Sequence, residues 1–187
     1  MQWKIVKAWV VLIGLLSFIG LPGCSSSIED YRGTSPDFQL YDYFDGQVKA
    51  WGMLQDWQGT LTRRFEVDIR GVVAGDQLTL YEDFRFDDGE EQQRTWVIHR
   101  GLDSGQYVGR AGDVIGEATG QSVGHALRWQ YVLRVPVGET TYDISIDDWM
   151  YRQDNLRVFN RATMKKWGVT VGTITLFFEK QTSDSDQ

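Results

Sequence analysis

Hydrophobic and polar residues alternate along most of the chain, from about residue 48 to residue 178. Within 60–72, the apolar residues Leu61, Phe65 and Val67 fall on one face and charged residues fall on the other. The alternation recurs in further stretches, at residues 78–86, 127–135, 142–146 and 169–177. A period of two is typical of strands with one buried face. The pattern predicts about nine or ten consecutive strands joined by short turns.

A meander of this length has to hide its edges, because exposed strand edges invite aggregation. Closure into an up-and-down barrel removes the edges. We therefore predict an all-β fold, an antiparallel meander closed into an up-and-down barrel, with a two-sheet β-sandwich as the alternative that the pattern leaves open. A barrel of about eight or more strands has room inside for a small ligand.

The first residues have the three parts of a signal peptide. The apolar run at 8–21 is shorter than the ~20 residues of a membrane-spanning helix, and it ends in Leu21-Pro22-Gly23-Cys24. This ending resembles the lipobox of bacterial lipoproteins, in which Cys24 is acylated, and Ser25 resembles the sorting signal for the outer membrane. We expect a signal peptide at 1–23, a flexible tether at 24–36, a β-barrel domain at 37–180 and a disordered tail at 181–187.

The composition indicates one folded domain that binds no polyanion. The chain has 187 residues, of which 13% are aromatic, and this supplies enough buriable area to exclude disorder. A net charge of −7 argues against nucleic acid as a partner. Cleavage of the signal peptide would remove Lys4 and Lys7 and no acid, which changes the charge to −9. Attachment to the periplasmic face of the outer membrane would then depend on the acyl chains.

The hairpin near residue 75 predicts which residues face the interior. A two-residue turn at 74–75 sets Phe65 opposite Phe84. The same register sets Val67 opposite Glu82. All four positions fall on the apolar face, so Glu82 is a carboxylate in an apolar row.

The next hairpin has two interpretations. Asp88-Gly89 is a strong signal for a two-residue turn. A longer turn over 87–91 would instead point Arg94, Trp96 and Ile98 inward, beside the inward residues Phe84, Glu82 and Leu80. Only the longer turn supplies Glu82 with a cation.

The hairpin around Asp154-Asn155 is predicted to bring an aspartate to Arg161. A two-residue turn sets Asp148 opposite Arg161, and a turn one residue longer sets Asp147 there. We predict a buried pair between Arg161 and one of these aspartates. Its role is either a salt bridge that fixes the register or a polar group that faces a ligand.

Glycines recur every four residues, at positions 101, 105 and 109 and again at 116, 120 and 124. On strands this spacing keeps them on one face, where an aromatic ring such as Trp129 or Tyr131 can lie. The spacing matches neither a dinucleotide fingerprint nor a phosphate loop.

Residues with catalytic chemistry are few. His99 and His125 are the only histidines and Cys24 is the only cysteine, so we expect no metal site, no cofactor and no catalytic residue. The adjacent acids Asp147-Asp148 point to opposite faces of a strand and form no facing pair.

Several longer motifs carry a resemblance to a known family. They are Asp87-Asp88-Gly89-Glu90, Arg94-x-Trp96, the glycine-rich stretch from Tyr107 to Gly120, Trp129-x-Tyr131-x-Leu133, Asp147-Asp148-Trp149-Met150 and Asn160-Arg161-Ala162. The chain resembles an uncharacterised family of bacterial lipoproteins, domain-of-unknown-function family 3833. The resemblance implies a lipocalin-like fold and assigns no catalytic residue. It points to Glu82, Arg94, Trp96, Asp148 and Arg161, the same inward polar candidates that the registers select.

Two functions from different classes follow. The first is an outer-membrane-anchored barrel that binds or chaperones a lipid or other apolar ligand in the periplasm. The second is a structural or assembly factor with a filled barrel that binds another envelope protein, and an enzyme acting on lipid is a third hypothesis. For the first we expect a ligand site lined by Phe65, Val67, Leu80, Glu82, Phe84, Arg94, Trp96, Trp129, Tyr131, Asp148 and Arg161.

Overall fold

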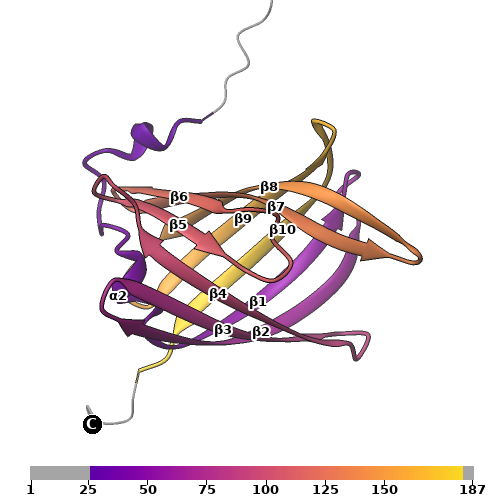
Figure 1. Cartoon of the computed structure of the whole chain (residues 1–187), viewed down its shortest axis with the longest axis horizontal. Coiled ribbons are helices and arrows are strands. Elements are labelled where there is room, and N and C mark those ends of the chain that lie inside the picture. Colours follow the sequence, from indigo (N-terminus) through magenta and orange to yellow (C-terminus); the bar gives the residue numbers. More distant parts are fainter. Residues whose placement is uncertain (1–25, 183–187) are drawn as a thin grey trace, which may run out of the picture.

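Ten strands wind around a closed barrel, and two short helical segments precede them (Figure 1). The computed structural model describes residues 26–182. The expected signal peptide, the lipidation site Cys24 and tail residues 183–187 lie outside the described residues. The elements are η1 (Ile28–Tyr31), α2 (Leu40–Phe44), β1 (Gly46–Asp56), β2 (Leu61–Ala74), β3 (Gln77–Phe86), β4 (Glu91–Arg100), β5 (Gln106–Arg110), β6 (Ala118–Val123), β7 (Ala126–Val137), β8 (Thr140–Arg152), β9 (Arg157–Lys166) and β10 (Val169–Lys180).

Every strand pairs antiparallel with the next one in the chain, and β1 pairs with β10 to close the barrel. The closing register runs from Val48 opposite Lys180 to Asp56 opposite Gly172. No edge is left, which is the condition that the long meander imposes. The predicted closed up-and-down barrel is confirmed, and the alternative of a two-sheet sandwich is wrong.

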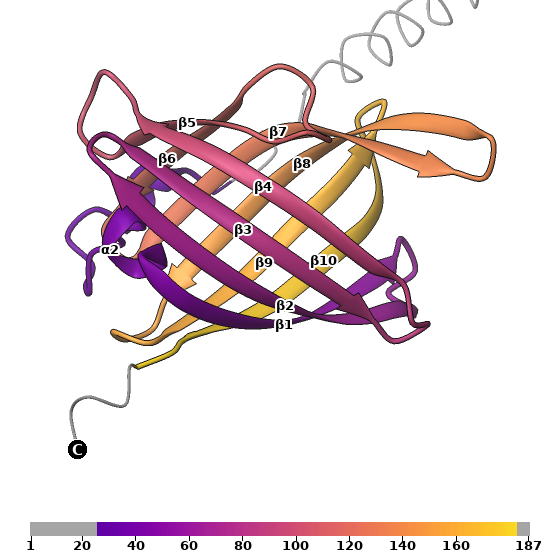
Figure 2. The ribbon, with the colours of Figure 1, turned by 60° about the horizontal axis from the view of Figure 1, so that its bottom comes forward.

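One end of the barrel is closed by α2 (Figure 2). A five-residue helix is not stable alone, and α2 is held by its buried aromatic residues. The Tyr41 hydroxyl donates hydrogen bonds to the carbonyls of Asp76, at 2.8 Å, and Ile98, at 3.0 Å. The Tyr43 hydroxyl donates to the carbonyl of Leu156 at 3.0 Å. The helix is therefore tied to three separate parts of the barrel and forms its floor.

The segment before α2 packs against the same end of the barrel. Ser27 caps η1, and Ile28 is buried. The ring of Tyr31 contacts His125 and Tyr151, with centroids 5.4 and 5.6 Å apart. The Thr34 hydroxyl accepts a hydrogen bond from the His125 amide at 3.1 Å. Residues 27–34 of the expected tether are therefore packed on the barrel instead of extending from it.

Two hairpins have the predicted inward faces in a shifted register. Between β2 and β3 the turn lies at Gly75-Asp76, so Val67 faces Phe84 instead of Glu82. A shift of two residues leaves each side chain on its predicted face. In the next hairpin Phe86 N–H donates to the Glu90 carbonyl, which closes a turn longer than two residues.

The turn between β3 and β4 is shorter than the predicted 87–91 turn, because Glu91 already pairs with Arg85, and it brings together the two charged residues of this wall. Arg94 faces Glu82, and Trp96 faces Leu80. Both Arg94 and Trp96 point inward, as only the longer of the two predicted turns allows, although each lies two residues from the partner expected for it. Glu82 thus obtains its cation.

The predicted buried pair of Arg161 with an aspartate is wrong. Arg161 lies opposite Trp149 and is exposed on the outer surface. Neither expected register, with Asp148 or Asp147 opposite Arg161, occurs. The Gln153 amide donates to the Arg157 carbonyl, which closes a turn at residues 154–156. The Asp154 carboxylate stabilises it by accepting from two backbone amides. One extra residue moves every following side chain of β9 to the other face, and Asn160 takes the inward position.

Candidate ligand cavity

The barrel encloses a cavity of about 280 Å³ above the α2 floor. Its size is close to the lower end of the range for ligand pockets, about 300–1,000 Å³. All the predicted apolar wall residues line it: Phe65, Val67, Leu80, Phe84 and Trp129. Glu82, Arg94, Trp96, Tyr131 and Asp148 line it too. Of the residues predicted for the site, only Arg161 lies outside.

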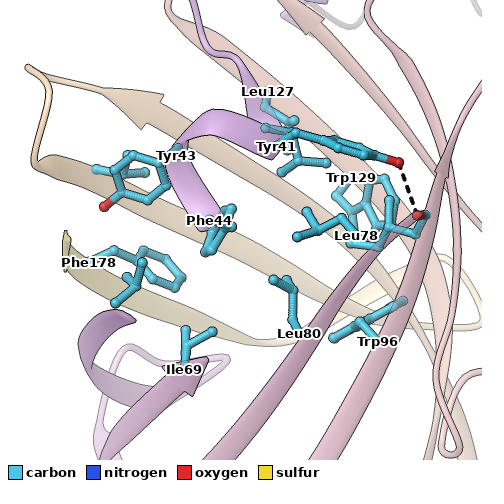
Figure 3. Packing of buried hydrophobic residues seen from close by; sticks show 14 of the residues in the cluster. Tyr41, Tyr43, Phe44, Ile69, Leu78, Leu80, Trp96, Leu127, Trp129 and Phe178 are labelled. Carbon is cyan, nitrogen blue, oxygen red and sulfur yellow. Dashed lines mark hydrogen bonds between the residues drawn. The ribbon is translucent and has the colours of Figure 1, made fainter. Parts of the chain in front are cut away.

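An aromatic corner forms one side of the cavity (Figure 3). Trp96 meets Trp129 edge to face, with ring centroids 5.9 Å apart, and meets Tyr131 in the same way at 5.5 Å. A Cβ atom at Gly120 would lie 1.9 Å from the Trp129 ring, and one at Gly109 would lie 2.7 Å from it. The predicted glycine strip therefore supports Trp129, whereas Tyr131 packs against Trp96.

The α2 floor contacts the apolar wall directly. Figure 3 shows Phe44 pointing from the helix toward the strands, and its ring lies 5.9 Å from that of Phe178. A Cβ atom at Gly71 would lie 1.7 Å from the Phe44 carbonyl oxygen. Only glycine at position 71 lets the helix approach the wall this closely.

Arg94 joins two acidic side chains at the cavity wall. Its Nε and Nη2 donate to Oδ2 of Asp113 at 2.9 and 2.7 Å. Its Nη1 lies 3.8 Å from Oε2 of Glu82, which is too far for a hydrogen bond. That oxygen is buried and has no hydrogen-bond partner among the described residues. Burial raises the pKa of Glu82 to about 7, with Arg94 opposing the rise and Asp113 and Asp148 adding to it.

A second buried carboxyl lies on β8. Asp148 and Asn160 are 7% and 2% exposed, and the Asn160 amide donates to Oδ1 of Asp148. Burial raises the pKa of Asp148 to about 7 despite this hydrogen bond, and the charge of Asp147 adds to the rise. Oδ1 of Asn160 is buried without a partner among residues 26–182. A proton on Asp148 would give this oxygen a donor, so the neutral acid suits its surroundings.

The sequence patterns did not identify the α2 floor, nor Asp113 and Asn160, which bind the lining residues Arg94 and Asp148 from outside the cavity lining. Asn160 appears only in a motif of the family resemblance and is not among the inward candidates. Asp113 lies in the loop between β5 and β6, where no alternation exists, and the backbone bond from Arg134 N–H to the Asp113 carbonyl, 2.8 Å long, holds it. The cluster of aromatics at 38–44 is the one available signal for α2.

The end of the barrel opposite α2 carries exposed apolar residues. We call this end, where the β1–β2, β3–β4, β7–β8 and β9–β10 turns lie, the mouth (Figure 1). Trp57 in the first of these turns is 70% exposed, and Trp167 in the last is 92% exposed. Arg63 lines the cavity near the mouth and binds Asp88 and Glu90 at 2.7 and 2.6 Å.

Within residues 26–182 no helix is long and apolar enough to cross a bilayer. In the same part of the chain, no three His, Cys, Asp or Glu side chains are placed to hold a metal ion.

Comparison with solved structures gives the class of the fold. The S-type phycobiliprotein lyase CPES from Guillardia theta superposes with a TM-score of 0.56 over 78% of this chain and 92% of that chain, at 10% sequence identity. This similarity concerns the fold alone, and the barrel is of the lipocalin-like class. The model of the family described as "Protein of unknown function (DUF3833)" matches residues 18–180, and the chain belongs to this family. Comparison with curated proteins gives no match.

Proposed function

We propose that this protein is an outer-membrane-anchored lipoprotein whose barrel binds a lipid or other apolar small molecule in the periplasm. The observation that carries the proposal is the cavity of about 280 Å³ inside the barrel, with its apolar wall and a few polar groups. Such a combination is typical of small-molecule sites. Burial of each large apolar side chain is worth about 1.5–3 kcal/mol, and a bound apolar ligand would supply part of this.

The anchor is proposed to be the acylated Cys24. Ser27, which caps η1 at the closed end of the barrel, is three residues after Cys24 in the sequence. Three residues span at most about 10 Å. The closed end would then lie next to the outer membrane, and the mouth with its exposed tryptophans would point away from it.

A titration with Nile red, a neutral apolar dye, tests the ligand site. We expect saturable dye fluorescence with energy transfer from the cavity tryptophans Trp96 and Trp129. Leu80→Trp should fill the cavity and weaken binding by about tenfold or more. Tyr81→Trp is the matched control, because Tyr81 is the next residue along β3 and points outward with 40% exposure. If Leu80→Trp binds the dye as tightly as the natural protein does, an internal site is refuted.

A second candidate function is an assembly factor that binds another envelope protein, and one observation favours it. On the outer surface, the ring of Phe177 lies 6.1 Å from that of Trp51 and 5.3 Å from that of Phe159. Phe159 is 51% exposed. If this aromatic row binds the partner protein, Phe159→Ser should abolish function in cells and leave Nile red binding unchanged.

A further inference from the structure

The two arginines that line the cavity already have carboxylate partners. Arg94 donates through Nε and Nη2 to Asp113, and Arg63 donates through Nη2 to Asp88 and Glu90. The remaining Nη1 of Arg94 faces Glu82 at 3.8 Å. Each guanidinium thus faces two acidic side chains, so neither supplies excess positive charge for a negatively charged ligand.

Three buried polar atoms have no hydrogen-bond partner in the described part of the chain: Oε2 of Glu82, Oδ1 of Asn160 and Nε of Arg63. Of these residues, Glu82 and Arg63 line the cavity, and Asn160 lies behind Asp148. Arg63 is near the mouth and already pairs with two carboxylates, so the free acceptor inside the cavity is Oε2 of Glu82. Asp148 is contacted by the Asn160 amide, and no described cation forms an ion pair with it. Buried polar atoms without partners are rare, because burial removes their hydrogen bonds to water without replacing them.

From this arrangement we infer that the cavity selects an amphiphile whose headgroup donates hydrogen bonds and carries no negative charge, such as a long-chain alcohol or amide. The inference rests on the proposed function and adds the chemistry of the headgroup. A hydroxyl or amide N–H beside Glu82 would satisfy its free oxygen. A carboxylate or phosphate at the same place would bring a third negative group next to Glu82 and Asp148, in surroundings of low dielectric that strengthen the repulsion.

Energetic considerations agree with a neutral headgroup. The raised pKa values of Glu82 and Asp148 follow from burial first, so the wall tolerates additional charge poorly. A protonated carboxyl can donate a hydrogen bond to a hydroxyl or carbonyl oxygen, and it can also accept one from a hydroxyl or an amide N–H. An alcohol or amide can therefore be bound in either protonation state.

Displacement of Nile red tests the inference with dodecanol, dodecanamide and dodecanoate, which share a chain length and differ in the headgroup. At about pH 8, where dodecanoate is ionised, we expect the alcohol and the amide to bind about tenfold or more tightly than dodecanoate, as one hydrogen bond to a charged group allows. Glu82→Gln should reduce this ratio severalfold by strengthening dodecanoate binding. Glu66→Gln is the matched control, because Glu66 is on β2 with its side chain 47% exposed.

The ratio of dodecanol affinity to dodecanoate affinity, compared between variants, separates headgroup recognition from simple solubility. An unchanged ratio in Glu82→Gln overturns the inference, because the preference would then come from the chain alone. If Glu82→Gln does not fold, Asp148→Asn removes the other carboxylate of the cavity wall and should change the affinity ratio in the same direction. Tighter binding of dodecanoate than of dodecanol by the natural protein also overturns the inference but leaves the proposed function standing. Failure of Nile red to bind at all refutes the proposed function itself.

Discussion

Replacing Asp148 by asparagine should stabilise the protein much more above about pH 7 than near pH 5. The pKa of Asp148 is about 7 in the folded protein, because the side chain is buried. In an unfolded chain the pKa of an aspartate is about 3.9. Between these two values the folded state holds a proton that the unfolded state releases. Its contribution to stability therefore falls as the pH rises from about 4 to about 7.

The size of the effect follows from the same two values. About three pKa units at roughly 1.4 kcal/mol each give a loss of up to about 4 kcal/mol between low and high pH. Asparagine has the shape of the neutral acid and can donate to the buried Oδ1 of Asn160, which has no partner now. The variant should therefore avoid most of this loss. Glu82, whose pKa is also about 7, keeps part of the pH dependence in both proteins.

Urea unfolding followed by tryptophan fluorescence, at about pH 5 and about pH 8, measures the difference. We expect Asp148→Asn to gain about 3 kcal/mol more relative to the natural protein at the higher pH than at the lower, because about two of the three pKa units lie above pH 5. Asp147→Asn is the control, because Asp147 binds Arg128 at 2.7 Å near the outer surface, and it should give no such gain. A stability difference for Asp148→Asn that is the same at both pH values would refute the argument.

Three further predictions concern the floor, the wall and the anchor. Gly120→Ala should destabilise the protein by about 1–3 kcal/mol in urea unfolding, because the new Cβ would meet the Trp129 ring at 1.9 Å. Gly112→Ala, which has open space around it, should change much less. Tyr41→Phe should cost about 0.5–1.5 kcal/mol in the same assay by removing the one hydroxyl hydrogen that the carbonyls of Asp76 and Ile98 share, and no loss would show that α2 is not held by these bonds. Cys24→Ser should abolish labelling by a fatty-acid analogue, and persistent labelling would contradict the lipobox.

The alternation of residues was enough to predict the barrel and most of its lining. Val67 and Phe84 stay on the inner face when the β2–β3 register shifts by two residues, because side chains repeat with that period. Arg161 shows the limit of the method. One residue more in its turn moves it outside, and the length of that turn depends on hydrogen bonds of Asp154 that no pattern of polarity reveals.

The remaining parts of the cavity depend on contacts between distant segments. A helix as short as α2 has no periodic signal, and its position depends on bonds from Tyr41 and Tyr43 to remote carbonyls. Asp113 reaches Arg94 from a loop that has no register with β4. Such positions follow from tertiary packing, which local sequence does not encode on its own.

Native mass spectrometry of the protein purified from its own envelope is the most direct test of the internal ligand site. Spectra should be recorded under conditions that preserve non-covalent complexes. We expect the natural protein to carry a bound apolar molecule, and Leu80→Trp, which fills the cavity, to lack it while Tyr81→Trp keeps it. A natural protein that carries no ligand, or an adduct that is equally abundant in Leu80→Trp, would contradict the account of a ligand-binding barrel.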